Sequence, residues 1–286
     1  MKHEFVNKDG IGSLIMQYGE PSISKNYFQD QTHKRYYSIA WNTGNDQIIR
    51  IDEVSYRFES NAVLPIMLNQ SFDFEHAESI VMWRFNREFY CVLTQDPVVS
   101  CVGFIFYGPS PTMFVNLDEE HLIRLEGLLA IFREEFDSKE DVKDDMLRML
   151  LVRLIIIITR LAKRQHLGNE DLPDDKYNLI RQFCVFVEKH FRQEHQLAFY
   201  ANLLNKSPKT ISNHFSLYSK KKPTQIIQDR IILEARRLFY YTDKSVKEIA
   251  FDLGFEDVGH FSKFFKKATN HNPSEIKKIT RLFPDK

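Results

Sequence analysis

Apolar and polar positions follow the same arrangement twice between Leu197 and Phe265, first over residues 200–215 and again over residues 249–265. Each copy begins with an apolar-Ala-x-x-Leu helix face and continues through a turn residue that tolerates a positive φ. A short cap and a second helix with apolar residues four apart follow in both copies. This pattern predicts two helix-turn-helix motifs in one chain.

The residues at the turns and helix starts agree with that prediction. Asn205 and Gly254 stand where each turn needs a left-handed residue. Ser207-Pro208 is an N-cap followed by proline at the first helical position. Ser245 to Glu248 has the spacing of a reciprocal capping box at the start of the second motif. Asp257 is positioned to cap the second helix of that motif. Local chemistry therefore defines the start of each expected helix.

The helix after each turn presents polar side chains opposite its buried residues, and we expect its N-terminal end to enter a major groove. Base contacts are predicted from Lys209, Thr210, Ser212, Asn213, Val258, Gly259, His260, Ser262 and Lys263. Phosphate contacts are predicted from Lys220, Lys221, Lys222, Lys266 and Lys267. Two simpler interpretations stay open, a solvated loop for the lysine run and an idle surface imidazole for His260.

A long amphipathic stretch connects the two motifs. Pro223 begins a helix that is expected to continue to about Tyr241, a length of about 27 Å. With its flanking helices, this rod would hold the two recognition helices near the roughly 34 Å repeat between successive major grooves on one face of DNA. The stretch is therefore expected to set a separation as well as to fill a core.

Short β-like runs dominate the N-terminal half. They cover Tyr36–Trp41, Gln47–Phe58, Val63–Leu68, Ser79–Phe85, Phe89–Leu93 and Val98–Tyr107. Strands this short and frequent predict a sandwich or a barrel. Aromatic side chains would either fill its core or line a ligand pocket in its mouth. The pocket candidates are Trp41, Tyr56, Phe58, Trp83, Phe85, Phe104 and Phe106.

Two helices are predicted next, over about residues 118–136 and 140–166. The second carries a heptad-like seam that is about two heptads long, shorter than a confident coiled coil needs. The seam either dimerises the protein or packs within its own domain, and it consists of Leu147, Leu151, Leu154, Ile158 and Leu161. Gly, Pro and acidic residues then mark a linker at residues 167–176. The expected domains are 1–166, β-rich and regulatory, and 177–286, helical and DNA-binding.

Charge separates the two halves although the whole chain is neutral. Residues 177–286 contain 20 Lys/Arg against 11 Asp/Glu, a net of +9, and residues 1–176 contain 19 against 28, a net of −9. This division suggests that the C-terminal half alone meets a polyanion. Three cysteines without metal-binding spacing fit a reducing cytoplasm. The greasiest stretch, Leu150–Leu161, is too short and too charged to cross a bilayer, and no signal peptide is visible.

Enzymatic chemistry finds no support in the sequence. His76 and Glu78 stand two apart and His33 is distant, so no metal-ligand set is expected. No nucleophile-base ordering, glycine-rich phosphate loop or paired-carboxylate motif is present. We expect no catalytic residues, no metal and no cofactor. A cupin-type metal enzyme and a protein-interaction adaptor nevertheless remain the rival interpretations.

The stretch from Leu197 to Ile279 resembles the DNA-binding domain of AraC/XylS-type bacterial transcription regulators. The resemblance rests on residues 235–238, 245–250, 253–257, 261–267 and 272–275. It implies two helix-turn-helix units in adjacent major grooves and transcriptional activation, less often repression. RNA polymerase as a partner, a homodimer and a place at the nucleoid in the bacterial cytoplasm are implied as well. The chain departs from the family's pattern at the first turn, where Asn205 replaces the usual glycine, and at Asn213, where arginine is frequent.

The N-terminal half resembles the family's cupin-like sensor barrels in strand density and layout. Taken together, the sequence predicts an α+β chain of two domains. A β-rich sensor with dimerisation helices would precede an all-α domain with two helix-turn-helix motifs. The expected function is sequence-specific DNA binding that regulates transcription, biased by a small molecule or a partner.

Overall fold

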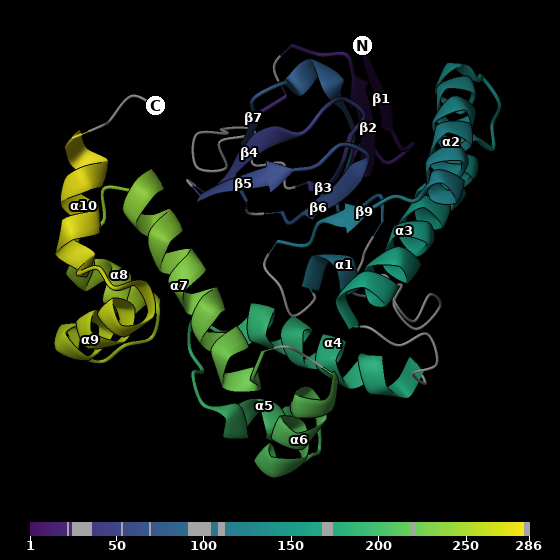
Figure 1. The fold of residues 1–286 in the computed structure, drawn as a ribbon. Coiled ribbons are helices and arrows are strands. Elements are labelled where there is room, and N and C mark those ends of the chain that lie inside the picture. The colour runs from purple at the N-terminus through teal and green to yellow at the C-terminus, as the bar shows by residue number, and fades with distance from the viewer. Residues whose placement is uncertain are drawn as a thin grey trace. The chain divides into compact units, whose positions relative to one another are not determined.

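The protein is described here by a computed structural model (Figure 1). The structure describes residues 1–21, 23–24, 36–52, 54–68, 70–90, 104–107, 112–167, 174–218 and 221–282. These residues form two compact units, of which the first ends at Asp174 and the second begins at Asp175. Among the described residues, no helix has the length and apolar content that a bilayer crossing requires.

The first unit contains two antiparallel sheets. Six strands form one sheet in the order β1-β2-β8-β3-β6-β9, and three form the other in the order β5-β4-β7. Their bounds are β1 Lys2–Val6, β2 Ser13–Tyr18, β3 Tyr37–Asn42, β4 Gln47–Ile51, β5 Val54–Phe58, β6 Ala62–Ile66, β7 Phe72–Phe74, β8 Ile80–Phe85 and β9 Val115–Asn116. A 3₁₀ turn, Ala77–Ser79, precedes β8.

One face of the six-stranded sheet forms a core with the smaller sheet. Side chains alternate along a strand, so Ala40 and Met82, which are paired across β3 and β8, point to the same side. Both belong to an apolar cluster that includes Ile49 and Phe58 of the smaller sheet. This cluster is the interior between the two sheets.

Helices cover the opposite face of the six-stranded sheet. The Trp83 ring on β8 lies 5.8 Å from the Phe132 ring on α2 (Glu119–Asp137). Asp118 caps α2, and its carboxylate accepts the backbone N–H of His121 at 2.9 Å. The longer α3 (Lys143–Leu167) lies against α2 (Figure 1). The central strands β3 and β6 are therefore buried on both faces of the sheet.

The sandwich part of the sequence prediction is confirmed, and the closed barrel is wrong. The larger sheet ends at β1 and β9 and the smaller one at β5 and β7, so the described strands close no ring of hydrogen bonds. The stretch Gln47–Phe58, predicted as one run, folds as β4 and β5. The break falls at Asp52, which adopts a φ of 46° and so turns the chain.

Two further strand predictions differ from the structure. Phe104–Tyr107 forms a short helix, α1, instead of the end of a strand. Phe89 does not extend a strand, because its backbone N–H donates to the Asn86 side chain at 3.0 Å and the chain turns there. Residues 91–103 lie outside the described part of the chain. Strands β1 and β2 lie in a region from which the sequence predicted no element.

The heptad-like seam of α3 lies in the core of the first unit. Its five residues, from Leu147 to Leu161, are 0–3% exposed in the single chain. On α2, Leu125, Leu128 and Phe132 are buried as well. Dimerisation through Leu147, Leu151, Leu154, Ile158 and Leu161 is therefore wrong, because these side chains already fill the protein's own core, as the alternative interpretation held.

Within its described residues, the second unit consists of seven helices, which Figure 1 labels α4 to α10. They are α4 Asp174–His190, α5 Leu197–Leu203, α6 Pro208–Tyr218, α7 Pro223–Tyr241, α8 Val246–Asp252, α9 Val258–Thr269 and α10 Pro273–Leu282. Helices α4 to α6 pack around one aromatic core, in which the Phe183 ring lies 5.5 Å from Tyr200 and 5.0 Å from Phe215. A second aromatic core lies between α7 and α9, where the Phe239 ring is 5.4 Å from Phe265. The 19-residue helix α7 thus connects two small aromatic cores.

The position of the seam yields a stability prediction. Replacing Leu151, which is fully buried, with aspartate removes core contacts and buries a carboxylate. We expect Leu151→Asp to lower the free energy of unfolding by at least about 4 kcal/mol in denaturant titrations. Met149→Asp on the same helix is the control, because Met149 is 68% exposed and its replacement should cost less than about 0.5 kcal/mol. If Leu151→Asp kept full stability and changed only the sedimentation rate, the seam would be a subunit contact after all.

Candidate nucleic-acid interface

The first motif consists of α5, a left-handed turn and α6. Asn205 has a φ of 51°, a conformation that asparagine tolerates better than most residues. Beyond it, the Lys206 N–H donates to the Ala201 carbonyl at 2.9 Å. Ser207 then caps α6, since its hydroxyl accepts the Thr210 N–H at 3.0 Å, and Pro208 is the first helical residue. The predicted turn and cap of the first motif are confirmed.

The second motif repeats this geometry in α8 and α9. Ser245 and Glu248 form both hydrogen bonds of the capping box. Gly254 has a φ of 77°, and the Phe255 N–H donates to the Ala250 carbonyl at 3.0 Å, the counterpart of the Lys206 bond. Asp257 caps α9 by accepting the His260 N–H at 2.6 Å. The two motifs therefore share one backbone design as well as one sequence pattern.

The predicted base-reading residues of α6 lie on its exposed side. Ile211 and Phe215 are fully buried. The residues between and before them are exposed, namely Lys209, Thr210, Ser212 and Asn213. The Thr210 hydroxyl is 2.8 Å from the Ser207 hydroxyl, so it takes part in the helix cap and is less available to a base than the other three.

On α9, the predicted residues divide into exposed and half-buried groups. Gly259, His260 and Lys263 are exposed, whereas Val258 and Ser262 are half-buried. The Ser262 hydroxyl donates to the Val258 carbonyl at 2.8 Å, which leaves this hydroxyl mainly an acceptor. The exposed polar side chains best placed to reach a base edge are therefore those of His260 and Lys263.

The predicted phosphate-binding lysines differ in their surroundings. Lys222, Lys266 and Lys267 are exposed, at the start of α7 and in the last turns of α9. Lys221 is held by Asp229 at 2.6 Å, and this ion pair competes with a phosphate for its ammonium group. Lys220 lies outside the described residues.

The predicted aromatic pocket is wrong as a single site, because its members lie on both faces of the six-stranded sheet. Phe58 is in the cluster between the sheets, whereas Trp83 packs on α2. Phe106 lies 6.0 Å from Phe85 on the helix-covered side. Register places Trp41 on that side too, Tyr56 is half-buried, and the side chain of Phe104 is outside the description. The buried members are core residues. Among the described residues, no three His, Cys, Asp or Glu side chains gather as metal ligands.

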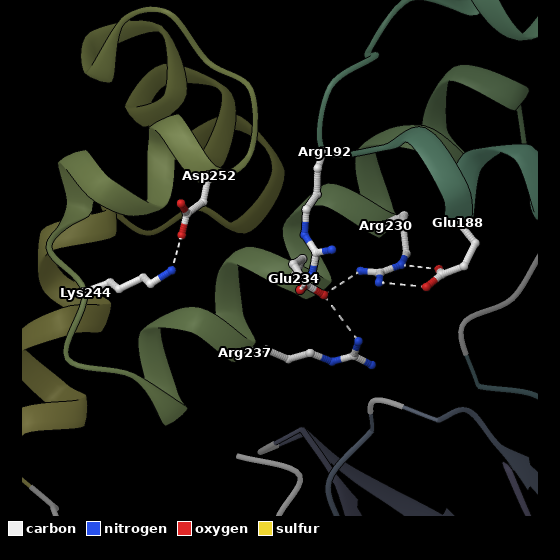
Figure 2. Close-up of polar contacts among 7 residues, drawn as sticks. All are labelled: Glu188, Arg192, Arg230, Glu234, Arg237, Lys244 and Asp252. Atoms are coloured by element: carbon white, nitrogen blue, oxygen red, sulfur yellow. Dashed lines mark hydrogen bonds and ion pairs between the residues drawn. The ribbon is translucent and has the colours of Figure 1, made fainter. Parts of the chain in front are cut away.

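A buried ion network, which the sequence analysis missed, connects α4 to α7 (Figure 2). The Arg230 guanidinium donates to both Glu188 oxygens, at 2.5 and 3.1 Å, and to Glu234 at 3.0 Å. Arg237 and Arg192 approach the same Glu234 carboxylate, whose side chain is 5% exposed. The signal was present in α7 as Arg230, Glu234 and Arg237 at i, i+4 and i+7 within an apolar stripe.

Electrostatics in this network favour the charged forms. Burial alone would raise the pKa of Glu234, but Arg230, Arg237 and Arg192 outweigh it and lower that pKa from the usual 4.5 to about 2. Burial likewise works against the charge of Arg230, and Glu188 with Glu234 more than compensates, so the pKa of Arg230 is raised. The bidentate Arg230–Glu188 pair therefore fastens the first motif's group to the connecting helix.

Comparisons with known proteins find the following similarities. Residues 200–279 match the family model described as a helix-turn-helix domain. The HTH-type transcriptional activator RhaS of Salmonella schwarzengrund (strain CVM19633) is 22% identical over 208 residues, which is 71% of this chain and 71% of RhaS. ToxT from Vibrio cholerae O395, solved with (E)-4-(8-methylnaphthalen-1-yl)but-3-enoic acid, aligns over 97% of this chain and 99% of its own, with 15% identity and a TM-score of 0.40. A probable AraC family transcriptional regulator from Rhodopseudomonas palustris CGA009 aligns over 36% and 97%, with 21% identity and a TM-score of 0.32.

The family match covers the same two capped motifs that the structure displays, and its relatives regulate transcription. The chain is therefore a DNA-binding transcriptional regulator with a β-rich first unit and a helical second unit. The resemblance to AraC/XylS-type regulators seen in the sequence is confirmed by the match of residues 200–279 and by the similarity to RhaS.

The ion network predicts how stability depends on pH. The pKa of Glu234 in the folded protein, about 2, lies below its unfolded value, so the carboxylate stabilises the fold above about pH 4.5 and this contribution is lost as the pH falls toward 2. We expect Glu234→Gln to lower the free energy of unfolding at pH 7 by about 3 kcal/mol. The gap to the native protein should narrow as the pH falls from about 4 to 2 in denaturant titrations.

Glu256→Gln is the matched control, because Glu256 is an exposed carboxylate of the same unit. Its replacement should change stability by less than about 0.5 kcal/mol at any pH. A Glu234→Gln protein as stable as the native one at pH 7 would contradict the role assigned to the network.

Proposed function

We propose that this regulator activates transcription by inserting α6 and α9 into two successive major grooves on one face of a DNA duplex. The observation that carries the proposal is the pair of equivalent motifs at the two ends of one 19-residue helix. Such a helix rises about 28 Å, close to the roughly 34 Å between successive major grooves. The name of the relative RhaS, a transcriptional activator, supports activation over repression.

The exposed side chains divide into two proposed roles. Lys209, Ser212 and Asn213 on α6, with His260 and Lys263 on α9, read base edges. Lys222, Lys266 and Lys267 neutralise phosphates. The net charge of +9 in residues 177–286 supports this role, because a polyanion attracts the second unit and repels the acidic first one.

The first unit acts as the regulatory part in this proposal. A small molecule or a partner protein that binds one of two conformations better than the other would shift the population able to bind DNA. RNA polymerase is the partner through which bound protein activates a promoter, and the working form is a homodimer at the bacterial nucleoid. The chain acts without enzymatic activity, consistent with relatives that are regulators. None of these assignments uses the buried seam of α3.

Salt dependence tests whether phosphate contacts hold the protein on DNA. Counterion release predicts that the logarithm of the association constant falls linearly with the logarithm of salt concentration, with a slope of about −0.9 for each phosphate neutralised. We expect an affinity loss of at least about 100-fold between 50 and 200 mM salt, measured by fluorescence anisotropy on a labelled duplex.

A triple variant, Lys222→Ala with Lys266→Ala and Lys267→Ala, should flatten that slope by about 3. Lys139→Ala in the first unit is the control and should leave the slope unchanged, because Lys139 is exposed but lies outside the DNA-binding unit. A protein that ignores duplex DNA even in dilute buffer would overturn the proposal.

Two lysines on α9 separate base reading from phosphate binding. Lys263→Ala should weaken binding to a duplex selected from a random pool by about 10-fold, and weaken binding to random duplexes much less. Lys267→Ala, four residues further along the exposed side, should weaken both alike. Competition binding measures the ratio of the affinities for the selected duplex and for random duplexes. Equal losses on both duplexes for Lys263→Ala would remove it from the base-reading set.

A further inference from the structure

One loop contacts the first motif, the connecting helix α7 and the second motif. Residues 191–196, here called the junction loop, connect α4 to α5. The Tyr200 hydroxyl of α5 donates to the Glu194 carbonyl at 2.6 Å, which ties the loop to the first motif. Arg192 reaches the Glu234 carboxylate of α7 (Figure 2). His195 Nε2 lies 2.8 Å from the Leu253 carbonyl, in the turn of the second motif.

The backbone of the junction loop also lies directly on the second turn. A Cβ atom added to Gly254 would stand 2.3 Å from the Arg192 carbonyl oxygen and 3.3 Å from the Gln193 Cα atom. Both are backbone atoms, which cannot move aside without shifting the loop. The glycine at this turn therefore serves close approach as well as the positive φ of 77°.

His195 continues the contact toward the second recognition helix. A carbonyl oxygen accepts hydrogen bonds, so the Nε2 atom of His195 carries the hydrogen that Leu253 receives. Its ring centroid lies 4.7 Å from that of Phe255, and Phe255 in turn lies 5.2 Å from Phe261 and 5.3 Å from Phe264 on α9. A direct chain of contacts thus runs from the loop to α9 without passing through α7.

We propose that the junction loop fixes the angle and separation between α6 and α9, and so determines which spacing of DNA elements the protein accepts. Two other contacts lead to α7: Glu188 of α4, the helix that packs on the first motif, pairs with Arg230, and Phe265 of the second motif packs on Phe239. A helix held at its two ends can still bend and twist. The contact of the junction loop with the second turn is a third attachment, made directly between the motifs, and it removes that freedom. This inference rests on the proposed use of both motifs on one duplex.

Distance measurements test the loop without DNA. Spin labels at Leu203→Cys on α5 and Lys247→Cys on α8 report the separation of the motifs, since both positions are exposed helix residues. The background carries Cys91→Ser and Cys101→Ser. Cys184 stays, because burial raises the pKa of its thiol to about 12 and leaves it unreactive. We expect one narrow distance distribution, which His195→Ala broadens or shifts by more than about 3 Å.

His190→Ala is the matched control. His190 belongs to α4, and its ring packs on Phe199 of α5 at 5.3 Å, inside the first motif's group. It should leave the distance distribution unchanged. If His195→Ala fails to fold, as judged by circular dichroism, His195→Phe replaces it, because phenylalanine keeps an aromatic ring beside Phe255 but has no N–H to donate to the Leu253 carbonyl. An unaltered distribution in the folded variant would overturn the inference.

DNA spacing gives the functional readout. In a duplex that the native protein selects from a random pool, one inserted base pair between the two contacted segments rotates them by about 34° and separates them by about 3.4 Å. We expect native protein and His190→Ala to lose at least about 30-fold in affinity on this insertion, and His195→Ala less than about 5-fold. Equal losses in all three proteins would refute the role of the loop. If no duplex is selected at all, the proposed function fails, while the distance measurement still decides on the loop.

Discussion

The organisation of the DNA-binding unit depends on one buried carboxylate. Glu234 lies among the guanidinium groups of Arg192, Arg230 and Arg237, and it is stable there only while those partners stay in place. The same Arg230 grips Glu188 on α4 with two hydrogen bonds. Planar guanidinium groups suit this arrangement, because each can serve two carboxylate oxygens at fixed angles. A buried charge that tolerates few geometries thus determines the position of α4, and of the first motif packed against it, relative to α7.

Local chemistry explains why the second unit was predictable from sequence. Ser245 with Glu248, Asp257 and Ser207 each bind backbone groups within three residues, so their spacing in the chain already determines the hydrogen bond. The left-handed turns are equally local, because asparagine and glycine are the residues that adopt a positive φ at low cost. Both motifs were therefore predicted, along with the long helix between them.

Long-range pairing explains what the sequence did not reveal. Whether Trp83 faces the smaller sheet or α2 depends on the register of β8 between β2 and β3, and strand alternation alone does not choose the side. The seam of α3 has the heptad-like spacing of a dimerisation helix. An apolar stripe has the same sequence pattern whether it packs on α2 or on another chain. The Arg230–Glu188 pair and the contact of His195 with Leu253 join residues 42 and 58 positions apart. No local pattern encodes such contacts.

The two turn residues also bear on how this pair of motifs can evolve. Asn205 carries a side chain in the left-handed conformation, whereas at Gly254 the Arg192 carbonyl occupies the space where a Cβ would lie. The repeats are therefore not interchangeable modules: a gene conversion that copied the first turn into the second would drive an asparagine into a neighbouring backbone. The opposite change, a replacement of Asn205 by glycine, meets no conformational barrier, because glycine adopts the positive φ of that position readily.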